Sequence, residues 1–360
     1  MHKPAGPMGS SNHALTRKEF NTFYTIAGGL LQIETSDDWL LGWVTGFLDG
    51  FHLIKLGGPS EREAAVTLSV RRNESFSIPA GLQSFAIDRG FCHTDGRTFF
   101  LDVDQSLVVI DEPQTRRVEV LFGSTAHARH PVAMVNAFAY GLQAALRRAG
   151  VFDVHAAGVV EPATGAGALF IGSSGSGKTT LTINLTAHGW QYLTDDMIVL
   201  RETVAGLTAE GLRRLFAVTE LSLAGPTLQP LKNALGDTVA SDRTKRKLWP
   251  ETVFPERRAT SCHPRVLFFP RVTGETKTTI AKMSSRAAME RLVRFCPWAS
   301  YDTVAAPEYL RVLARLANQC QSYDLHAGCD LLGEPARVAN LLAPYLEQRE
   351  TFRGDIRKAS

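Results

Sequence analysis

The chain has 360 residues, of which 44% are hydrophobic and 21% are charged, so it has ample apolar material for a globular core. Its formal net charge of +3 at pH 7 is small, which argues against a nucleic-acid partner. The most apolar long stretch, residues 39–56, is interrupted by Asp49, His52 and Lys55, so we expect no membrane-spanning segment and no membrane partner.

The five cysteines are scattered along the chain, and none stands in the C-x-x-C spacing of a zinc site or a redox motif. Residues 1–15 lack the apolar segment of a signal peptide and predict a disordered lead-in. We therefore expect a cytoplasmic protein with reduced thiols.

Residues 16–129 predict an accessory lobe rich in antiparallel strands, because short β-branched and aromatic runs recur between turn residues. Within it, residues 108–112 imitate the apolar strand that ends in a magnesium-binding carboxylate. Since the Asp-Glu-Pro triplet at its end is a good turn on its own, we interpret this run as structural.

Residues 130–150 predict a helix that ends near Arg147 and Arg148 and is followed by Gly150. We interpret His127 and His130 at its start as loop residues rather than a metal pair, because a proline follows directly. The helix opens a core expected over residues 130–349, with a tail over residues 350–360. Strands at 265–272 and 321–328 and helices at 284–295, 306–319 and 334–346 complete this α/β core.

The most specific motif is G-x-x-x-x-G-K-[ST] at residues 172–179. Glycines let backbone N–H groups approach phosphate oxygens, and the helix that follows directs its positive end at the anion. A strand at 168–171 and a helix ending before Gly189 complete the expected context. Lys178 would reach the β- and γ-phosphates, and the Thr179 hydroxyl would help to hold Mg²⁺. The expected nucleotide-binding residues are Gly172, Ser173, Ser174, Gly175, Ser176, Gly177, Lys178, Thr179 and Thr180.

Two predicted strands beside the loop carry candidate catalytic residues: residues 154–160 contain His155, and residues 190–202 contain Asp195 and Asp196. Because neighbours on a strand point to opposite faces, we expect two different jobs for the aspartates. Asp195 would order the Mg²⁺ shell and Asp196 would accept the proton of an attacking hydroxyl, with the reverse assignment left open. On the residues alone, His155 fits a structural histidine better than a catalytic one.

The stretch from His155 to Asp196 resembles the catalytic core of the HPr kinase/phosphorylase family. The shared parts are a histidine before Gly158, the phosphate loop and an Asp-Asp strand opened by a Gly-aromatic pair, in that order. The "GWQYLTDD" wording and the long N-terminal lobe look more like the stand-alone kinases of ribosomal-peptide clusters, including those that phosphorylate the C-terminal serine of lasso-peptide precursors. The resemblance implies a phosphoenolpyruvate-carboxykinase-like P-loop core, ATP, Mg²⁺ and transfer to a serine-type hydroxyl. It implies phosphate and metal contacts for Lys178 and Thr179, and a catalytic role for Asp195 and Asp196 with His155 beside them.

In that family a Glu-x-Arg-Gly signature follows the acidic strand. This chain keeps Glu220 but has Ser222 in the arginine's place, so we do not carry over the phosphorylase activity or HPr as the substrate. A basic run follows at residues 241–258, which we predict as a loop that clamps a phosphoryl group or receives an acceptor carboxylate, or is simply solvated. The expected substrate or phosphate contacts are Glu220, Lys245 and Arg246.

The predicted function is therefore transfer of the γ-phosphoryl group of Mg·ATP to a peptide serine, foremost the C-terminal serine of a lasso-type precursor. A kinase of a small hydroxyl metabolite (free serine, a sugar or a nucleotide) stays open, as do GTP or pyrophosphate as donor and a homo-oligomeric state. A nucleotide switch or transport ATPase is less favoured, because N-K-x-D and L-S-G-G-Q motifs are absent.

Overall fold

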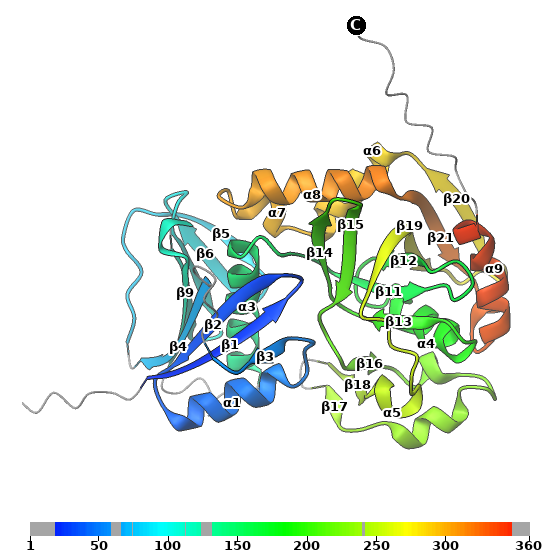
Figure 1. Ribbon diagram of the computed structural model, residues 1–360, viewed down its shortest axis with the longest axis horizontal. Helices are drawn as coiled ribbons and strands as arrows, with labels where there is room; N and C mark the ends of the chain where they lie inside the picture. The colour runs from blue at the N-terminus through cyan, green and yellow to red at the C-terminus, as the bar shows by residue number, and fades with distance from the viewer. Residues whose placement is uncertain are drawn as a thin grey trace, which may run out of the picture.

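The computed structural model describes residues 19–58, 66–73, 75–111, 113–123, 132–239 and 242–347. Their strands form two nine-stranded sheets and a small three-stranded sheet, so the architecture is mixed α/β (Figure 1). None of the helices in these parts of the chain combines the length and the apolar character needed to cross a membrane.

The first sheet has the strand order β3-β1-β2-β4-β9-β8-β7-β6-β5. Most neighbours are antiparallel, as the sequence predicts, but β4 lies parallel to both β2 and β9. We call this sheet together with α1 (Asp38–Leu48) the N-terminal lobe. The strands are β1 (Phe20–Ile26), β2 (Gly29–Thr35), β3 (Ile54–Leu56), β4 (Val66–Asn73), β5 (Gln83–Ile87), β6 (Gly90–Thr94), β7 (Phe99–Val103), β8 (Ser106–Ile110) and β9 (Arg117–Gly123).

Helix α1 was not predicted from the sequence. This helix begins after Asp37, whose side chain accepts the Leu40 N–H at 2.8 Å and so satisfies one of the free donors of the first turn. The Trp43 ring meets Phe138 edge-on at 5.6 Å between ring centroids, which joins α1 to α3.

The predicted helix at 130–150 is present as α3 (Ala133–Arg148). Two interpretations rest on His127, His130 and Glu112, which lie outside the described residues, as do the predicted lead-in at 1–15 and tail at 350–360. α3 packs against β8 and β9 of the first sheet (Figure 1). The apolar face of α3 therefore packs on the sheet of the N-terminal lobe, although the domain boundary predicted at residue 130 assigns the helix to the core. That boundary stays a prediction.

The second sheet has the order β10-β14-β15-β19-β12-β11-β13, and β21 joins β19 on a branch that ends in β20. β12, β19 and β21 run parallel, so their carboxyl ends meet at one edge. The strands are β10 (Phe152–Val154), β11 (Ala156–Val160), β12 (Ala166–Ile171), β13 (Gln191–Thr194), β14 (Ile198–Thr203), β15 (Gly206–Gly211), β19 (Ser261–Val272), β20 (Thr279–Met283) and β21 (Gln321–Ala327).

Helices cover both faces of the second sheet. Along β19, Val266 and Phe268 belong to the buried cluster on one face, and Leu267 and Phe269 belong to the cluster on the other, as the two-residue period of a strand requires. The helices at 284–295, 306–319 and 334–346 lie where the sequence predicts them. The first face is covered by α4 (Lys178–Ala187) and α9 (Pro335–Glu347), and the second by α6 (Ser285–Phe295), α7 (Trp298–Tyr301) and α8 (Ala306–Gln319).

The basic run corrects one prediction. Residues 242–248 are not a loop but the central strand of the third sheet, because they pair with neighbours on both sides. This sheet has the order β16-β18-β17 and lies beside α4 (Figure 1). Its elements and the short helices nearby are β16 (Phe216–Val218), η2 (Leu221–Leu223), η3 (Gln229–Ala234), β17 (Thr238–Val239), β18 (Asp242–Leu248) and α5 (Pro250–Val253).

Candidate active site

The G-x-x-x-x-G-K-[ST] motif connects the carboxyl end of β12 to the first residue of α4. Gly175 and Gly177 have φ of 81° and 100°, a left-handed conformation that other residues adopt only with strain. A Cβ at Gly172 would lie 2.7 Å from the Ser176 hydroxyl, which is buried and has no hydrogen-bond partner in the described parts of the chain. The loop therefore combines close backbone packing with an unsatisfied hydroxyl at the amino end of a helix, a combination that suits an anion.

Lys178 is almost fully buried under this loop. Its ammonium donates to the carbonyl oxygens of Gly172 at 2.6 Å and Ser173 at 3.0 Å, and it lies 3.2 Å from Nε2 of His155. Burial lowers the pKa of Lys178 below its ordinary 10.5, and Asp196 and Asp195 oppose that effect. Lys178 is thus held at the loop by three acceptors.

Two strands expected to be continuous are each interrupted at the functional residues. His155 lies between β10 and β11, and Asp195 and Asp196 lie between β13 and β14. Because β10 pairs with β14 and β11 pairs with β13, the two interruptions face each other. Asp195 and Asp196 therefore do not alternate along one strand as predicted, and the paired breaks bring His155 to the acidic pair.

Asp196 is held by two basic side chains. Its Oδ1 lies 3.3 Å from His155 Nδ1, and its Oδ2 accepts from Arg213 Nη1 at 2.7 Å. The Lys178 ammonium can only donate, so His155 accepts through Nε2 and carries its proton on Nδ1, toward Asp196. Burial raises the pKa of Asp196, but Arg213, then His155 and Lys178, outweigh it and hold that pKa below 3.8.

Asp195 has a different environment. It is 2% exposed, and its Oδ2 accepts from the Thr179 hydroxyl at 2.9 Å and from the Ala217 N–H at 3.0 Å. Its Oδ1 is buried and has no partner among the described residues. Burial, and next the charge of Asp196, raise the pKa of Asp195 to about 6.

The residues present fit a magnesium ion that also binds phosphate. Within the described ranges no three His, Cys, Asp or Glu side chains are grouped to hold a metal by themselves. Mg²⁺ at nucleotide sites typically takes one or two carboxylates, with phosphate and water oxygens completing the octahedron. The unpartnered Asp195 Oδ1 and the neighbouring Thr179 hydroxyl are oxygen donors of this kind.

The three expected substrate contacts separate in the structure. Lys245 donates to Ser174 Oγ at 2.9 Å and so lies at the loop. Arg246, its neighbour on β18, donates instead to the carbonyl oxygens of Leu235 and Gly236, where it holds the chain before β17. Glu220 is exposed at the start of η2. Nearby, the Thr180 hydroxyl donates to Ser222 Oγ at 2.9 Å, which joins η2 to α4.

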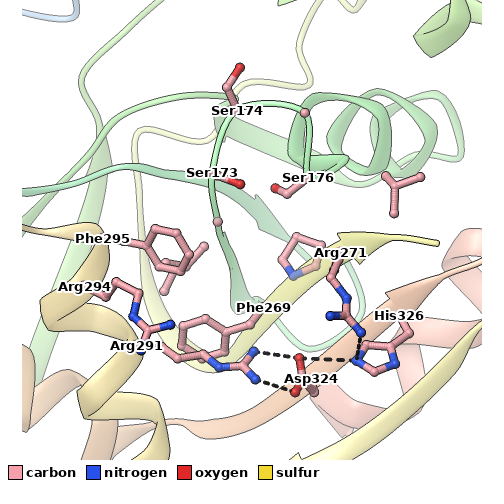
Figure 2. A pocket seen from close by; sticks show the side chains of 15 residues that line it. Ser173, Ser174, Ser176, Phe269, Arg271, Arg291, Arg294, Phe295, Asp324 and His326 are labelled. Carbon is pink, nitrogen blue, oxygen red and sulfur yellow. Dashed lines mark hydrogen bonds and ion pairs between the residues drawn. The ribbon is translucent and has the colours of Figure 1, made fainter. Parts of the chain in front are cut away.

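The other side of the loop borders a pocket of about 570 Å³, lined by residues 172–176, the end of β19, α6 and β21 (Figure 2). Arg291 donates from Nη1 and Nη2 to the two carboxylate oxygens of Asp324, at 2.6 and 2.5 Å. Nη2 of Arg271 lies 3.4 Å from Nε2 of His326. Arg294 also lines the pocket, and Figure 2 draws no interaction for it. Three guanidinium groups and one carboxylate leave the lining positively charged.

Sequence reasoning missed Arg213 and this pocket. The local signal for Arg213 is only that it is one of two adjacent arginines, and nothing in that pattern indicates contact with Asp196. The pocket residues come from segments far apart in the chain that only the parallel β12, β19 and β21 bring to one edge.

Comparisons with known proteins give little. No family model matches the chain, and no curated protein matches it significantly. Among solved structures, the chain is similar to the HPr(Ser) kinase/phosphatase from Coxiella burnetii, at 10% sequence identity and a TM-score of 0.28, over 53% of this chain and 94% of that one. A likeness this weak carries no argument about function, which must come from the site.

Proposed function

We propose that the chain is a phosphotransferase that moves the γ-phosphoryl group of Mg·ATP to a hydroxyl acceptor. The observation that carries this proposal is the Lys178–His155–Asp196–Arg213 series of contacts beside Thr179 and Asp195, all within reach of one phosphate-binding motif. A nucleotide switch needs the loop but has no use for two adjacent carboxylates, one buried and one partly exposed, whose pKa values are shifted in opposite directions.

The pocket and the acidic pair suggest how the donor lies. The pocket is lined by residues 172–176, the first half of the loop, whereas Thr179 at its end contacts Asp195. We infer that the nucleoside occupies the pocket, that the phosphates cross the loop, and that the γ-phosphoryl group lies next to Asp196. Arg271 and Arg294 would then add positive charge near the α-phosphate side.

In the proposed step, the acceptor oxygen bonds to the γ-phosphorus while the bond from that phosphorus to the β–γ bridging oxygen breaks, and ADP leaves with this oxygen. The proton of the acceptor hydroxyl passes to the Asp196 carboxylate, which Arg213 and His155 keep ionised and oriented. Lys178 stabilises the charge on the transferred group. Mg²⁺ held by Thr179 and Asp195 would supply further neutralisation of phosphate charge.

For the acceptor we propose a peptide serine, foremost the C-terminal serine of a lasso-type precursor, on the strength of the sequence resemblance. Lys245 donates to Ser174 Oγ at the loop and pairs with Asp242 at 3.3 Å, and we propose that it exchanges this exposed carboxylate for one of the acceptor.

The test is phosphoryl transfer from Mg·ATP, read by intact mass, to a peptide ending in serine and in parallel to a mixture of free serine, sugars and nucleosides. Lys178→Ala serves as the inactive control, and Lys55→Ala, an exposed lysine on β3, as the active one. A phosphorylated peptide supports the proposal in full. A phosphorylated metabolite keeps the phosphotransferase and replaces the acceptor, and ATP consumption without any modified acceptor contradicts it.

A further inference from the structure

The N-terminal lobe contacts the segment that carries Arg213. Directly after α1, the His52 N–H donates to the Leu212 carbonyl at 2.8 Å, and the Gly50 carbonyl accepts from the Arg214 N–H at 2.9 Å. Phe51 and Arg213 form an isolated antiparallel bridge between these two bonds. The turn after α1 thus pairs, strand-like, with a segment that connects the second sheet to the third.

The same segment forms a hydrogen bond with residues 195–197 between β13 and β14, which we call the acidic turn. The Leu212 N–H donates to the carbonyl of Met197, the residue after Asp196, at 2.9 Å. Leu212 therefore links the lobe to the acidic turn: its carbonyl accepts from His52, and its N–H donates to Met197. The Arg213 side chain then returns to Asp196 Oδ2 at 2.7 Å.

We call the pairing of residues 50–52 with residues 212–214 the joint, and the Arg214 side chain adds contacts to it. Its guanidinium donates to the Asp49 carbonyl at 3.2 Å, forms an ion pair with Glu251 at 2.6 Å and lies 5.5 Å from the centre of the Trp249 ring. It therefore joins the lobe to the segment that follows β18. Adjacent arginines face opposite ways here, so that Arg213 meets the acidic pair and Arg214 meets the lobe.

We propose that the N-terminal lobe acts as a positioning element for transfer: by holding residues 212–214, it sets Arg213 and hence the orientation of the Asp196 carboxylate. Arg214 is the positioning residue at the joint, because its contacts are with Asp49, Glu251 and Trp249 and not with the phosphate loop. The expected change in kcat rests on the proposed function, whereas the expected change in hydrogen exchange at the acidic turn does not. Misplacement of a catalytic group by about 1 Å can cost on the order of a hundredfold in rate, so a modest shift at this joint is measurable.

The experiment compares the wild type with Arg214→Gln, Arg213→Gln and the double variant. Arg286→Gln, which removes a largely exposed arginine on α6, is the control. Hydrogen exchange is measured in peptides covering residues 193–199, and kcat and the donor KM are measured for the acceptor found in the transfer assay. We expect faster exchange in Arg214→Gln, a kcat lowered about tenfold and a donor KM within about twofold of the wild type.

The double variant separates positioning from a merely structural role. If Arg214 acts through Arg213, adding Arg214→Gln to Arg213→Gln lowers kcat little further, because the carboxylate is already released. Arg214→Lys should restore part of the rate. Should Arg214→Gln be too unstable, Glu251→Gln loosens the same joint and must speed exchange at 193–199 in turn. Unchanged exchange there, or rate losses that multiply in the double variant, would overturn the inference. A wild type that transfers phosphate to no acceptor defeats the proposed function instead, and the exchange measurement still decides whether the lobe holds the acidic turn.

Discussion

The Thr179 hydroxyl donates to Asp195 Oδ2 at 2.9 Å, which ties the end of the phosphate loop to the buried member of the acidic pair. The other oxygen of that carboxylate has no partner among the described residues. A buried carboxylate oxygen without a partner is costly, and a cation bound with the phosphates would satisfy it. This contact connects the loop that we propose to bind phosphate to the aspartates that we propose to act on it.

Thr179→Val removes the hydroxyl with little change in shape. We expect the affinity for Mg·ATP to fall about ten- to a hundredfold, while the affinity for ATP in the presence of a chelator changes little, because the lost oxygen is a proposed ligand of the metal. Calorimetric titration with and without Mg²⁺ measures both. Thr208→Val on β15 is the control, and an equal loss with and without Mg²⁺ would contradict the assignment.

Asp196→Asn removes the proposed proton acceptor but keeps the side-chain shape. We expect kcat to fall by about a hundredfold to ten-thousandfold, which is the usual contribution of a general base, with nucleotide affinity retained. Asp195→Asn should instead weaken the dependence of binding on Mg²⁺. Single-turnover transfer and nucleotide titration on both variants separate the two roles. The exchanged pattern, with binding lost in Asp196→Asn and transfer alone lost in Asp195→Asn, would reverse them.

Arg294→Gln tests the pocket as the place of the nucleoside. If the donor occupies it, this variant should bind ATP more weakly, by up to about tenfold, and pyrophosphate as well as the wild type does. Arg286→Gln lies on the same helix and is 90% exposed, so it should leave both affinities unchanged. Equal weakening of ATP and pyrophosphate would place the effect of Arg294 at the loop and not in the pocket.

His52 predicts an acid sensitivity of the fold. Burial and then Arg258 lower the pKa of His52 from 6.5 to about 4; Arg214 contributes in the same direction and Glu251 opposes it. Above pH 6.5 the imidazole is neutral in both states. Between pH 6.5 and about 4 only the unfolded chain binds the proton, so the free energy of unfolding falls as the pH falls.

Urea unfolding at several values between pH 7 and pH 4.5 measures this effect. His52→Gln should flatten the dependence of the unfolding free energy on pH, and His263→Gln, at an exposed position on β19, serves as the control. If His52→Gln and the wild type lose stability in parallel, the histidine is not buried in its neutral form.

Gly211→Ala tests the close approach of two backbones near the acidic turn. A Cβ at Gly211 would lie 2.2 Å from the Leu193 carbonyl oxygen, and backbone cannot move aside as a flexible side chain does. We expect a loss of about 1–3 kcal/mol in the free energy of unfolding. Gly274→Ala, where the added carbon meets nothing within 4 Å, should be nearly neutral. Equal melting temperatures for the two variants would contradict the geometry.

The sequence predicts best where the pattern is local. The strand and helix around the loop and the bounds of α8 follow from apolar periodicity and end signals within a few residues. The failures are nonlocal. The basic run predicts a loop because its charged residues do not show the apolar alternation of a strand. It forms a strand because it pairs with β16 and β17. The breaks at His155 and at Asp195 are equally invisible in an apolar run, since they depend on which strand pairs with which.

The contact between Arg213 and Asp196 illustrates the same limit within the site. The two residues are 17 positions apart, on segments that no short motif relates, and the N-terminal lobe helps to bring them together. Motif reasoning supplied Lys178, Thr179 and the acidic pair, because their chemistry depends on spacing. The side chains that orient them depend on tertiary contacts and had to be found in the structure.

The most direct test of the central claim is calorimetric titration of Mg·ATP into the wild type, Lys178→Ala and Lys55→Ala. The account predicts saturable binding to the wild type and to Lys55→Ala, and binding to Lys178→Ala that is weaker by about a hundredfold or more, because Lys178 is the buried cation of the loop. No binding to the wild type, or equal binding to all three proteins, would contradict it.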